Sequence, residues 1–342
     1  MTQKILLTGG LGYIGSHTYV ELIAAGYDVV IVDNLSNSKL SVCDRLAKIT
    51  GQETSFIQAD ILDRSALSQI FAKDAFDAVI HFAGLKAVGE SVEKPLDYMQ
   101  VNVTGLVNIL QEMQTANVNA LVFSSSATVY DVSNVSPLKE GMPTGYTNPY
   151  GYTKLVCEQI LAQATHANPE LKTGILRYFN PAGAHSSGLI GEDPRDIPNN
   201  LMPYISRVAS GEYEFVRIWG DDYPTPDGTG VRDYIHVDDL ATGHVSSLHA
   251  LLDKGESHLV NLGRGQGYSV MDVLNAYSRA CGRELPHQIL PRRAGDIAQM
   301  YADVEQAKQV LGFEVCRDEV CRDMDAMCAT SWNWINTGAK DG

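Results

Sequence analysis

The segment that most constrains the fold runs from Ile5 to Ala25. It opens with the apolar run Ile5-Leu6-Leu7, which is typical of a buried strand, and continues through a glycine-rich loop into a helical pattern. Such a loop lets the backbone approach a pyrophosphate at the positive end of the helix. A glycine triplet can also be an ordinary tight turn, so the neighbouring segments must decide. The glycines fit both Gly-x-x-Gly-x-x-Gly and Gly-x-Gly-x-x-Gly, with Gly9, Gly10, Gly12 and Gly15.

A second buried strand, Val29 to Val32, ends in Asp33, eighteen residues after Gly15. A carboxylate at this place accepts hydrogen bonds from the adenine ribose hydroxyls and repels a 2′-phosphate. Asp33 therefore favours NAD over NADP as the cofactor. The alternative is that Asp33 is a turn or helix-capping acid.

Further strand patterns alternate with helical ones and end in polar or glycine-containing tips. Open parallel sheets of the α/β class bind ligands at the carboxyl ends of their strands, so we predict a doubly wound parallel sheet with these tips at the ligand. Lys86 is the one cation among them and is placed to reach the dinucleotide phosphates, unless it is an exposed loop lysine. The tips are Asp60-Ile61, which we place at the adenine edge, Ala83-Gly84-Leu85-Lys86 and Ser124-Ser125-Ser126.

The stretch Asn148 to Lys154 reads as the start of a long helix. Asn148 is a good N-cap and Pro149 suits the first helical position, so Tyr150 and Lys154 fall four apart on one face. A free phenol has a pKa of about 10, and a neighbouring ammonium and the helix N-terminus both lower it. With the hydroxyl of Ser126 nearby, this site suits proton transfer to or from an alcohol. A half-buried tyrosine beside a solvated lysine is the alternative.

Composition narrows the possible partners. The 342-residue chain carries a formal charge of −15, which disfavours nucleic acid and anionic membranes. Its six cysteines form no CxxC pair and lie at no zinc-ligand spacing, so we expect reduced thiols and no metal. No apolar run is long enough for a membrane span or a signal peptide, and we expect a cytoplasmic protein.

The pattern from 88 to 116 is long and helical, with more apolar surface than one sheet contact needs. We therefore expect a homodimer, formed through helices near 91–116 and 150–166. After residue 181 the chain turns to Gly/Pro-rich segments with short helices, including 201–209 and 269–281.

Four longer motifs resemble the extended short-chain dehydrogenase/reductase family and, within it, the UDP-glucose 4-epimerases. The similarity runs from Lys4 to about Asp303. The motifs are His81–Ser91, Ser124–Tyr130, Leu176–Pro181 and Gly230–Val237.

The resemblance implies a Rossmann domain over residues 1–180 and a smaller mixed α/β substrate domain over 181–342, with the chain crossing back to the first domain at about 232–250. It also implies reversible interconversion of UDP-galactose and UDP-glucose with a tightly held NAD. In that chemistry Tyr150 takes the proton of the sugar 4-hydroxyl, Ser126 hydrogen-bonds alongside, and Lys154 holds the phenolate and the nicotinamide ribose.

The resemblance further implies two sets of binding residues, in addition to Ser126, Tyr150 and Lys154, which serve in both steps. The cofactor set is Gly9, Gly12, Tyr13, Ile14, Gly15, Asp33, Asn34, Asp60, Ile61, Phe82, Ala83, Gly84, Lys86 and Phe179. The UDP-hexose set is Asn180, Asn200, Leu201, Arg217, Trp219, Arg232, Arg293, Asp296 and Met300.

Several residues bear on competing functions. Ala127-Thr128 cannot perform the acid/base work of nucleotide-sugar dehydratases, which carry Asp-Glu there. Met300 stands where a bulky residue excludes N-acetylated sugars and a small one admits them, so a UDP-N-acetylhexosamine 4-epimerase, or one of dual specificity, is an open alternative. Retention of Ser126, Tyr150 and Lys154 argues against a third reading, a catalytically silent NAD-binding regulator. Asp131 and Val101 depart from the family pattern.

Overall fold

The computed structural model describes residues 2–195, 198, 200–293, 295–317 and 320–337. Its centre is a seven-stranded sheet in which every pairing is parallel. The strand order is β3-β2-β1-β4-β5-β6-β10, so the order reverses between β1 and β4, where doubly wound sheets bind ligands. The strands are β1 (Lys4–Thr8), β2 (Asp28–Asp33), β3 (Ser55–Gln58), β4 (Ala78–His81), β5 (Ala120–Ser126), β6 (Lys172–Tyr178) and β10 (His258–Leu262).

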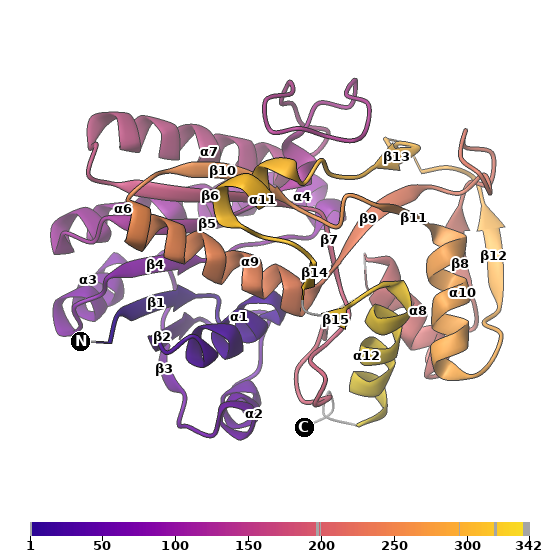
Figure 1. Cartoon of the computed structure of the whole chain (residues 1–342), viewed down its shortest axis with the longest axis horizontal. Coiled ribbons are helices and arrows are strands. Elements are labelled where there is room, and N and C mark those ends of the chain that lie inside the picture. The colour runs from indigo at the N-terminus through magenta and orange to yellow at the C-terminus, as the bar shows by residue number, and fades with distance from the viewer. Residues whose placement is uncertain (1, 196–197, 199, 294, 318–319, 338–342) are drawn as a thin grey trace.

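Helices cover both faces of this sheet (Figure 1). Alternate strand residues face opposite layers: Ile5 and Leu7 pack into one core and Leu6 into the other. This confirms the predicted doubly wound α/β fold. The first layer holds α1 (Tyr13–Ala24), α2 (Ser41–Thr50), α9 (Val237–His249) and α11 (Glu305–Leu311). The second holds α3 (Arg64–Lys73), α6 (Gly105–Ala116) and α7 (Pro149–Ala167).

The helical pattern predicted over 88–116 is not one helix. It is divided into α4 (Val88–Glu93), α5 (Pro95–Tyr98), the π-helical turn η1 (Met99–Thr104) and α6. The break falls at Pro95, which occupies the first position of α5 because its ring nitrogen cannot donate a helical hydrogen bond. The side chain of Tyr98 links α5 to the start of α4 by donating to the carbonyl of Ala87 at 2.8 Å.

The remaining elements form a smaller mixed α/β part beside the large sheet (Figure 1). Strand β9 pairs with β11 antiparallel and with β7 and β13 in parallel, while β8 and β12 form a separate parallel pair. The strands are β7 (Asn180–Ala182), β8 (Val216–Trp219), β9 (Val231–His236), β11 (Gly267–Ser269), β12 (His287–Leu290), β13 (Gln299–Met300), β14 (Cys316–Arg317) and β15 (Val320–Cys321). The helices of this part are α8 (Leu201–Ala209), α10 (Val270–Cys281) and α12 (Met324–Asn336). Two short helical segments belong instead to the large part: η2 (Ala127–Val129) follows β5 and contacts α7, and η3 (Ala250–Lys254) continues α9.

The chain returns to the large sheet after β9. Helix α9 packs on α1, and β10 then adds the outermost strand beside β6. The chain after residue 181 therefore adds more to the large part than the segment 232–250 given by sequence: β10 joins the sheet, and α11 later packs in the first helical layer. Within the part of the chain that the structure describes, no helix is both long and apolar enough to cross a membrane.

Candidate active site

The glycine loop between β1 and α1 leaves no room for a side chain at Gly9 or Gly15. Gly9 has φ +70°, and a Cβ there would lie 2.7 Å from the backbone nitrogen of Ala83. A Cβ on Gly15 would lie 2.3 Å from the carbonyl oxygen of Gly9. Gly12 caps α1 with extended backbone and no side chain. Backbone amides at the start of α1 can therefore be approached closely by a phosphate group.

Asp33 lies at the end of β2 against this loop. Its carboxylate accepts from the backbone amides of Leu11 at 3.1 Å and Leu35 at 2.9 Å, and from the hydroxyl of Ser38 at 2.8 Å. The Leu35 contact is a turn interaction, so the alternative role as a turn acid describes part of what Asp33 does. The hydrogen bond from Leu11 is not part of that turn, and it fixes the Asp33 carboxylate beside the glycine loop.

Six more of the predicted cofactor residues lie around this edge of the sheet. Asn34 donates to the carboxylate of Asp60 at 2.9 Å, which links the tips of β2 and β3. Ile61 packs so closely on α6 that a Cβ on Gly105 would approach its side chain to 2.3 Å. The backbone amide of Phe82 donates to Thr8 at 3.0 Å, which sets the loop through Ala83 and Gly84 beside β1.

Lys86 and Asn200, predicted from distant parts of the sequence, meet at one carboxylate. Oε1 of Glu192 lies 3.0 Å from Nζ of Lys86 and 3.1 Å from Nδ2 of Asn200. Leu201 follows as the first residue of α8. Both donors are thus brought together, and an anionic phosphate would compete with Glu192 for them. Sequence reasoning had not singled out Glu192.

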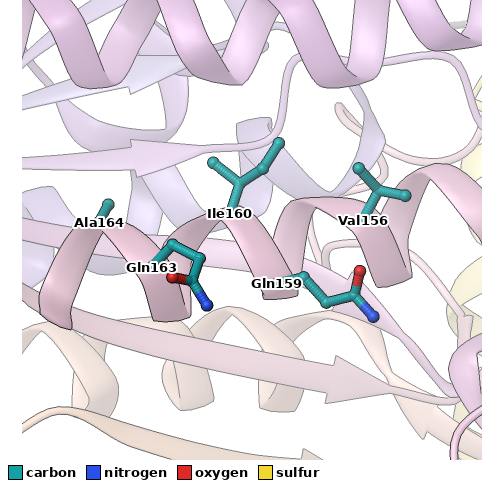
Figure 2. Close-up of a pocket in the computed structure, with 5 residues that line it drawn as sticks. All are labelled: Val156, Gln159, Ile160, Gln163 and Ala164. Atoms are coloured by element: carbon teal, nitrogen blue, oxygen red, sulfur yellow. The ribbon is translucent and has the colours of Figure 1, made fainter.

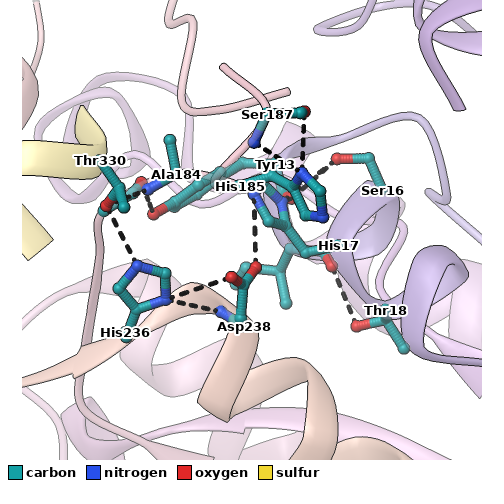
Figure 3. A network of polar contacts seen from close by, with 12 residues as sticks. Tyr13, Ser16, His17, Thr18, Ala184, His185, Ser187, His236, Asp238 and Thr330 are labelled. Carbon is teal, nitrogen blue, oxygen red and sulfur yellow. Dashed lines mark hydrogen bonds and ion pairs between the residues drawn. The ribbon is translucent and has the colours of Figure 1, made fainter. Parts of the chain in front are cut away.

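Tyr13 and its neighbours join α1 to the smaller part of the molecule (Figure 3). The hydroxyl of Tyr13 donates to the carbonyl of Gly183 at 2.7 Å. His17 lies 4.0 Å and His236 3.7 Å from the carboxylate of Asp238. Burial lowers the pKa of each histidine to about 3 and raises the pKa of Asp238 to about 7, so these contacts involve neutral imidazoles and are not ion pairs.

Helix α7 starts as its sequence predicts. The side chain of Asn148 accepts from the amide of Gly151 at 2.9 Å, and Pro149 takes the first helical position. Tyr150 and Lys154 consequently share a face, with Nζ of Lys154 5.9 Å from the centroid of the Tyr150 ring. The ammonium also donates to the carbonyl of Ser124 at 2.7 Å.

The protonation of this pair differs from the prediction. Burial raises the pKa of Tyr150 to about 12, with a smaller opposing effect from its hydrogen bond to Ser126. Burial also lowers the pKa of Lys154 to about 8. The predicted lowering of the phenol pKa by the ammonium is therefore wrong for this structure, because the cost of burying a phenolate is the larger effect.

Ser126 is the last residue of β5 and lies at hydrogen-bonding reach of Tyr150. Its hydroxyl oxygen accepts from the amide of Thr128 at 3.2 Å and from the Thr128 hydroxyl at 3.0 Å. These two hydrogen bonds occupy both lone pairs of the Ser126 oxygen. The hydroxyl proton can therefore be donated to the phenol or to a substrate oxygen.

Four predicted nucleotide-binding residues lie on β8 and on the segment that follows β12. The guanidinium of Arg293 is 5.7 Å from the centroid of the Trp219 ring and donates to the carboxylate of Asp296 at 2.9 Å. Arg217 on β8 is exposed, with its guanidinium 5.9 Å from the ring of Tyr204. This end presents an aromatic wall and two guanidinium groups, which suits a base and a diphosphate.

Arg232 and Met300 connect that end to the reactive residues. They are paired in register across β9 and β13, and Nη1 of Arg232 donates to the carbonyls of Val231 at 2.8 Å and Ile297 at 3.0 Å. Met300 packs against a small core that includes Ala127, next to Ser126, and Phe179, next to Asn180.

The comparisons with known proteins fit this geometry. The model of the NAD dependent epimerase/dehydratase family matches residues 5–263. The chain belongs to this family. Among its relatives, a UDP-glucose 4-epimerase of Bacillus subtilis is 52% identical to this chain over 338 residues. The match covers 99% of this chain and 98% of that protein.

Two solved structures show the same likeness in space. The UDP-glucose 4-epimerase of Stenotrophomonas maltophila, solved with bound NAD and formylated UDP-arabinopyranose, has a TM-score of 0.95 at 48% identity, covering 99% of this chain and 100% of that one. The UDP-glucose 4-epimerase of Bifidobacterium longum, in complex with NAD+ and UDP, has a TM-score of 0.92 at 47% identity. The match covers 99% of this chain and 100% of that one.

Asn102 makes a link near the site that was not predicted from the sequence. Its side chain accepts from the amide of Leu85 at 2.8 Å and donates to the Leu85 carbonyl and to the hydroxyl of Thr153, both at 3.0 Å. It therefore ties the loop after β4 to the first turn of α7. The only signal in the sequence was its place beside Val101, where the family pattern changes.

Proposed function

We propose that this chain interconverts UDP-galactose and UDP-glucose by transient oxidation at the sugar C4, with NAD held throughout the cycle. The supporting observation is that Ser126, Tyr150 and Lys154 converge at the same carboxyl edge of the sheet as a glycine loop that admits only glycine at two places. We assign the cofactor to residues 1–180 and the sugar nucleotide chiefly to residues 181–342.

The residues present fit NAD. The loop from Gly9 to Gly15 would receive its pyrophosphate, because a Cβ at either position would fill the space against the backbone. Asp33 would accept from the adenosine ribose, and Lys154 would hold the nicotinamide ribose. Bound NAD would supply the acceptor and later the donor of the C4 hydride, and its positive ring would lower the pKa of Tyr150 from about 12.

The chain's own part in the reaction is proton transfer and orientation. Tyr150 would take the 4-hydroxyl proton, with the Ser126 hydroxyl donating to the same sugar oxygen and Lys154 stabilising the phenolate. Arg232 and Arg293 would hold the diphosphate while the 4-keto sugar turns its other face to the ring. Tyr150 would then return the proton, which leaves one carbon inverted and no net redox change.

The decisive experiment supplies purified protein with UDP-galactose and no added nicotinamide. Formation of UDP-glucose without accumulation of reduced nucleotide is expected. A strict requirement for added NAD with net accumulation of NADH would instead indicate an ordinary dehydrogenase and overturn the proposal.

We also propose that the protein is a homodimer and that the outer face of α7 contributes to the interface. Figure 2 shows Ile160 and Val156 standing on one side of this helix and two glutamine amides beside them. This mixture of apolar and uncharged polar groups suits burial against another copy. The surface depression there is lined by Val156, Gln159, Ile160, Gln163 and Ala164.

The substitution Ile160→Glu should shift the protein toward monomer in sedimentation velocity, because it places a charge in the proposed interface. Glu170→Gln, at an exposed position beyond the end of α7, is the control and should leave the mass unchanged. A wild-type monomer would contradict the homodimer.

We further propose a cytoplasmic location. Within the described side chains, Cys43, Cys157, Cys281 and Cys328 are all free thiols, as suits a reducing compartment. Cell fractionation with an antibody to the native protein tests this.

A further inference from the structure

Three consecutive serines at the end of β5 face three residues of α7 that are spaced four apart. Ser126 lies at Tyr150, and the carbonyl of Ser124 accepts from Lys154 at 2.7 Å. The hydroxyl of Ser125 donates to Oε1 of Glu158 at 2.5 Å. Positions 150, 154 and 158 lie on one helical face, so Glu158 is one turn beyond Lys154 on the side that carries the reactive residues. The chemistry described above does not use Glu158.

Glu158 is also fixed from the neighbouring strand. Arg177 on β6 donates through Nε to Oε1 at 2.9 Å and through Nη2 to Oε2 at 2.6 Å. The residues Ser125 and Arg177 are partners in the β5–β6 register, so the carboxylate is held by two adjacent strands. Ser125, Glu158 and Arg177 are all buried. A two-point contact of this kind fixes orientation as well as distance.

Arg177 is itself anchored. Its Nη1 donates to the carbonyl of Glu140 at 3.2 Å, and its guanidinium lies 4.8 Å from the centroid of the Tyr130 ring. The hydroxyl of Tyr130 in turn donates to Asn261 on β10 at 2.6 Å. The guanidinium is thus held by the body of the sheet, and it transmits that position to α7 through Glu158.

We infer that Glu158 is a positioning residue for the reaction: clamped by Ser125 and Arg177, it sets the rotation of α7 that aims Tyr150 at Ser126 and places a negative charge behind Lys154. This inference rests on the proposed function. A helix turned about its axis by a few degrees would displace both reactive side chains together, and displacements near 1 Å cost about 100-fold in rate.

The charges around Lys154 support the second part of the inference. It is faced by Tyr150, Cys157 and Glu158 on its own helix and by His81 on β4, and Arg177 on β6 lies beyond Glu158. His81 is neutral, since burial lowers its pKa to about 3. Burial lowers the pKa of Lys154 to about 8, and the charge of Glu158 acts in the opposite direction. Removing that charge moves the loss of the ammonium to lower pH.

The test compares Glu158→Gln with Glu112→Gln, both loaded with NAD, over a range of pH. Glu112 on α6 is a matched control, because it is also a buried glutamate beside an arginine, with Arg64 at 3.4 Å, and it lies outside the reactive site. Glu158→Gln should lower kcat by roughly 10- to 100-fold, change KM for UDP-galactose by less than about 3-fold, and shift the alkaline limb of kcat to lower pH. Glu112→Gln should change none of these.

Ser125→Ala provides a second variant in case Glu158→Gln does not fold. It removes one contact, leaves the ion pair with Arg177, and should lower kcat by about 3- to 10-fold with unchanged NAD content. Folded variants with the wild-type kcat and pH profile, or a loss of activity that follows only a loss of folded protein, would overturn the inference. If the wild-type protein does not epimerise the sugar, it is the proposed function that fails.

Discussion

The two ends of the candidate site are built differently. At the reactive end, Tyr150 and Lys154 are buried and each polar group has a partner on a neighbouring strand. At the nucleotide end, the side chain of Arg293 is 53% exposed and its partner is Asp296, three residues along the chain. The first end is organised before any substrate arrives. The second holds Arg293 in a local pair that a diphosphate would have to exchange. We therefore expect turnover to depend on the reactive end and capture on the nucleotide end.

Tyr150→Phe is the strongest way to break the reactive end. The phenolic oxygen is lost while the ring and its packing remain, so kcat should fall by at least ~100-fold, the usual scale for losing an acid/base group. Steady-state kinetics and bound NAD content measure this. Tyr152→Phe, on the half-buried neighbouring position, is the control. Near-normal activity of Tyr150→Phe would remove this residue from the mechanism.

Arg293→Ala tests whether the nucleotide end serves capture. Loss of a charge-assisted contact to phosphate should raise KM for UDP-galactose by roughly 10- to 100-fold and leave kcat within about threefold. Arg292→Ala is the matched control, because Arg292 is held by Asp222 and stacks on Tyr223. An equal fall in kcat for Arg293→Ala would show that the two ends are not separate.

The pH profile sharpens the comparison through Lys154. Its pKa of about 8 lies below the ordinary value of 10.5, so the ammonium is present below pH 8 and is lost above it. We expect kcat to fall by about tenfold per unit at higher pH, because the phenolate loses its stabilising charge. In Lys154→Arg, which keeps its charge, that limb should disappear even if the maximum rate is lower. A limb that persists in Lys154→Arg belongs to another group.

Met300→Ala should have the smallest effect. Met300 is half-buried against the core that contains Phe179, so the shorter side chain would enlarge the space beside the sugar. The ratio of kcat/KM for UDP-N-acetylglucosamine to that for UDP-glucose should rise by about 3- to 10-fold, the scale of small changes in an apolar pocket. An unchanged ratio would assign sugar selection to other residues.

Local sequence signals predicted the parts of the molecule whose contacts are close in the chain. The cap at Asn148, the glycine turn at Gly9 and the alternation of strands and helices all depend on neighbouring residues. The helix predicted at 201–209 has those bounds.

What sequence could not supply depends on residues far apart. Lys86 and Glu192 are separated by 106 positions, and nothing near either one indicates that they pair. The pKa of Tyr150 depends on how deeply several elements together bury the phenol. The spacing between Tyr150 and Lys154 alone therefore predicted a lowered pKa, whereas the pKa is raised. The break at Pro95 could have been predicted, since proline is a local signal, but the periodicity of the surrounding apolar residues concealed it.

The late arrival of β10 has a consequence for how the protein is made. As a chain emerges from the ribosome, β6 keeps one hydrogen-bonding edge unpaired until residue 262 has been synthesised, although its neighbours on the other side are already in place. An open edge of this kind invites pairing with other nascent chains. A gene fragment ending near residue 180 should therefore yield aggregates, because the strand that closes the sheet is encoded beyond its end.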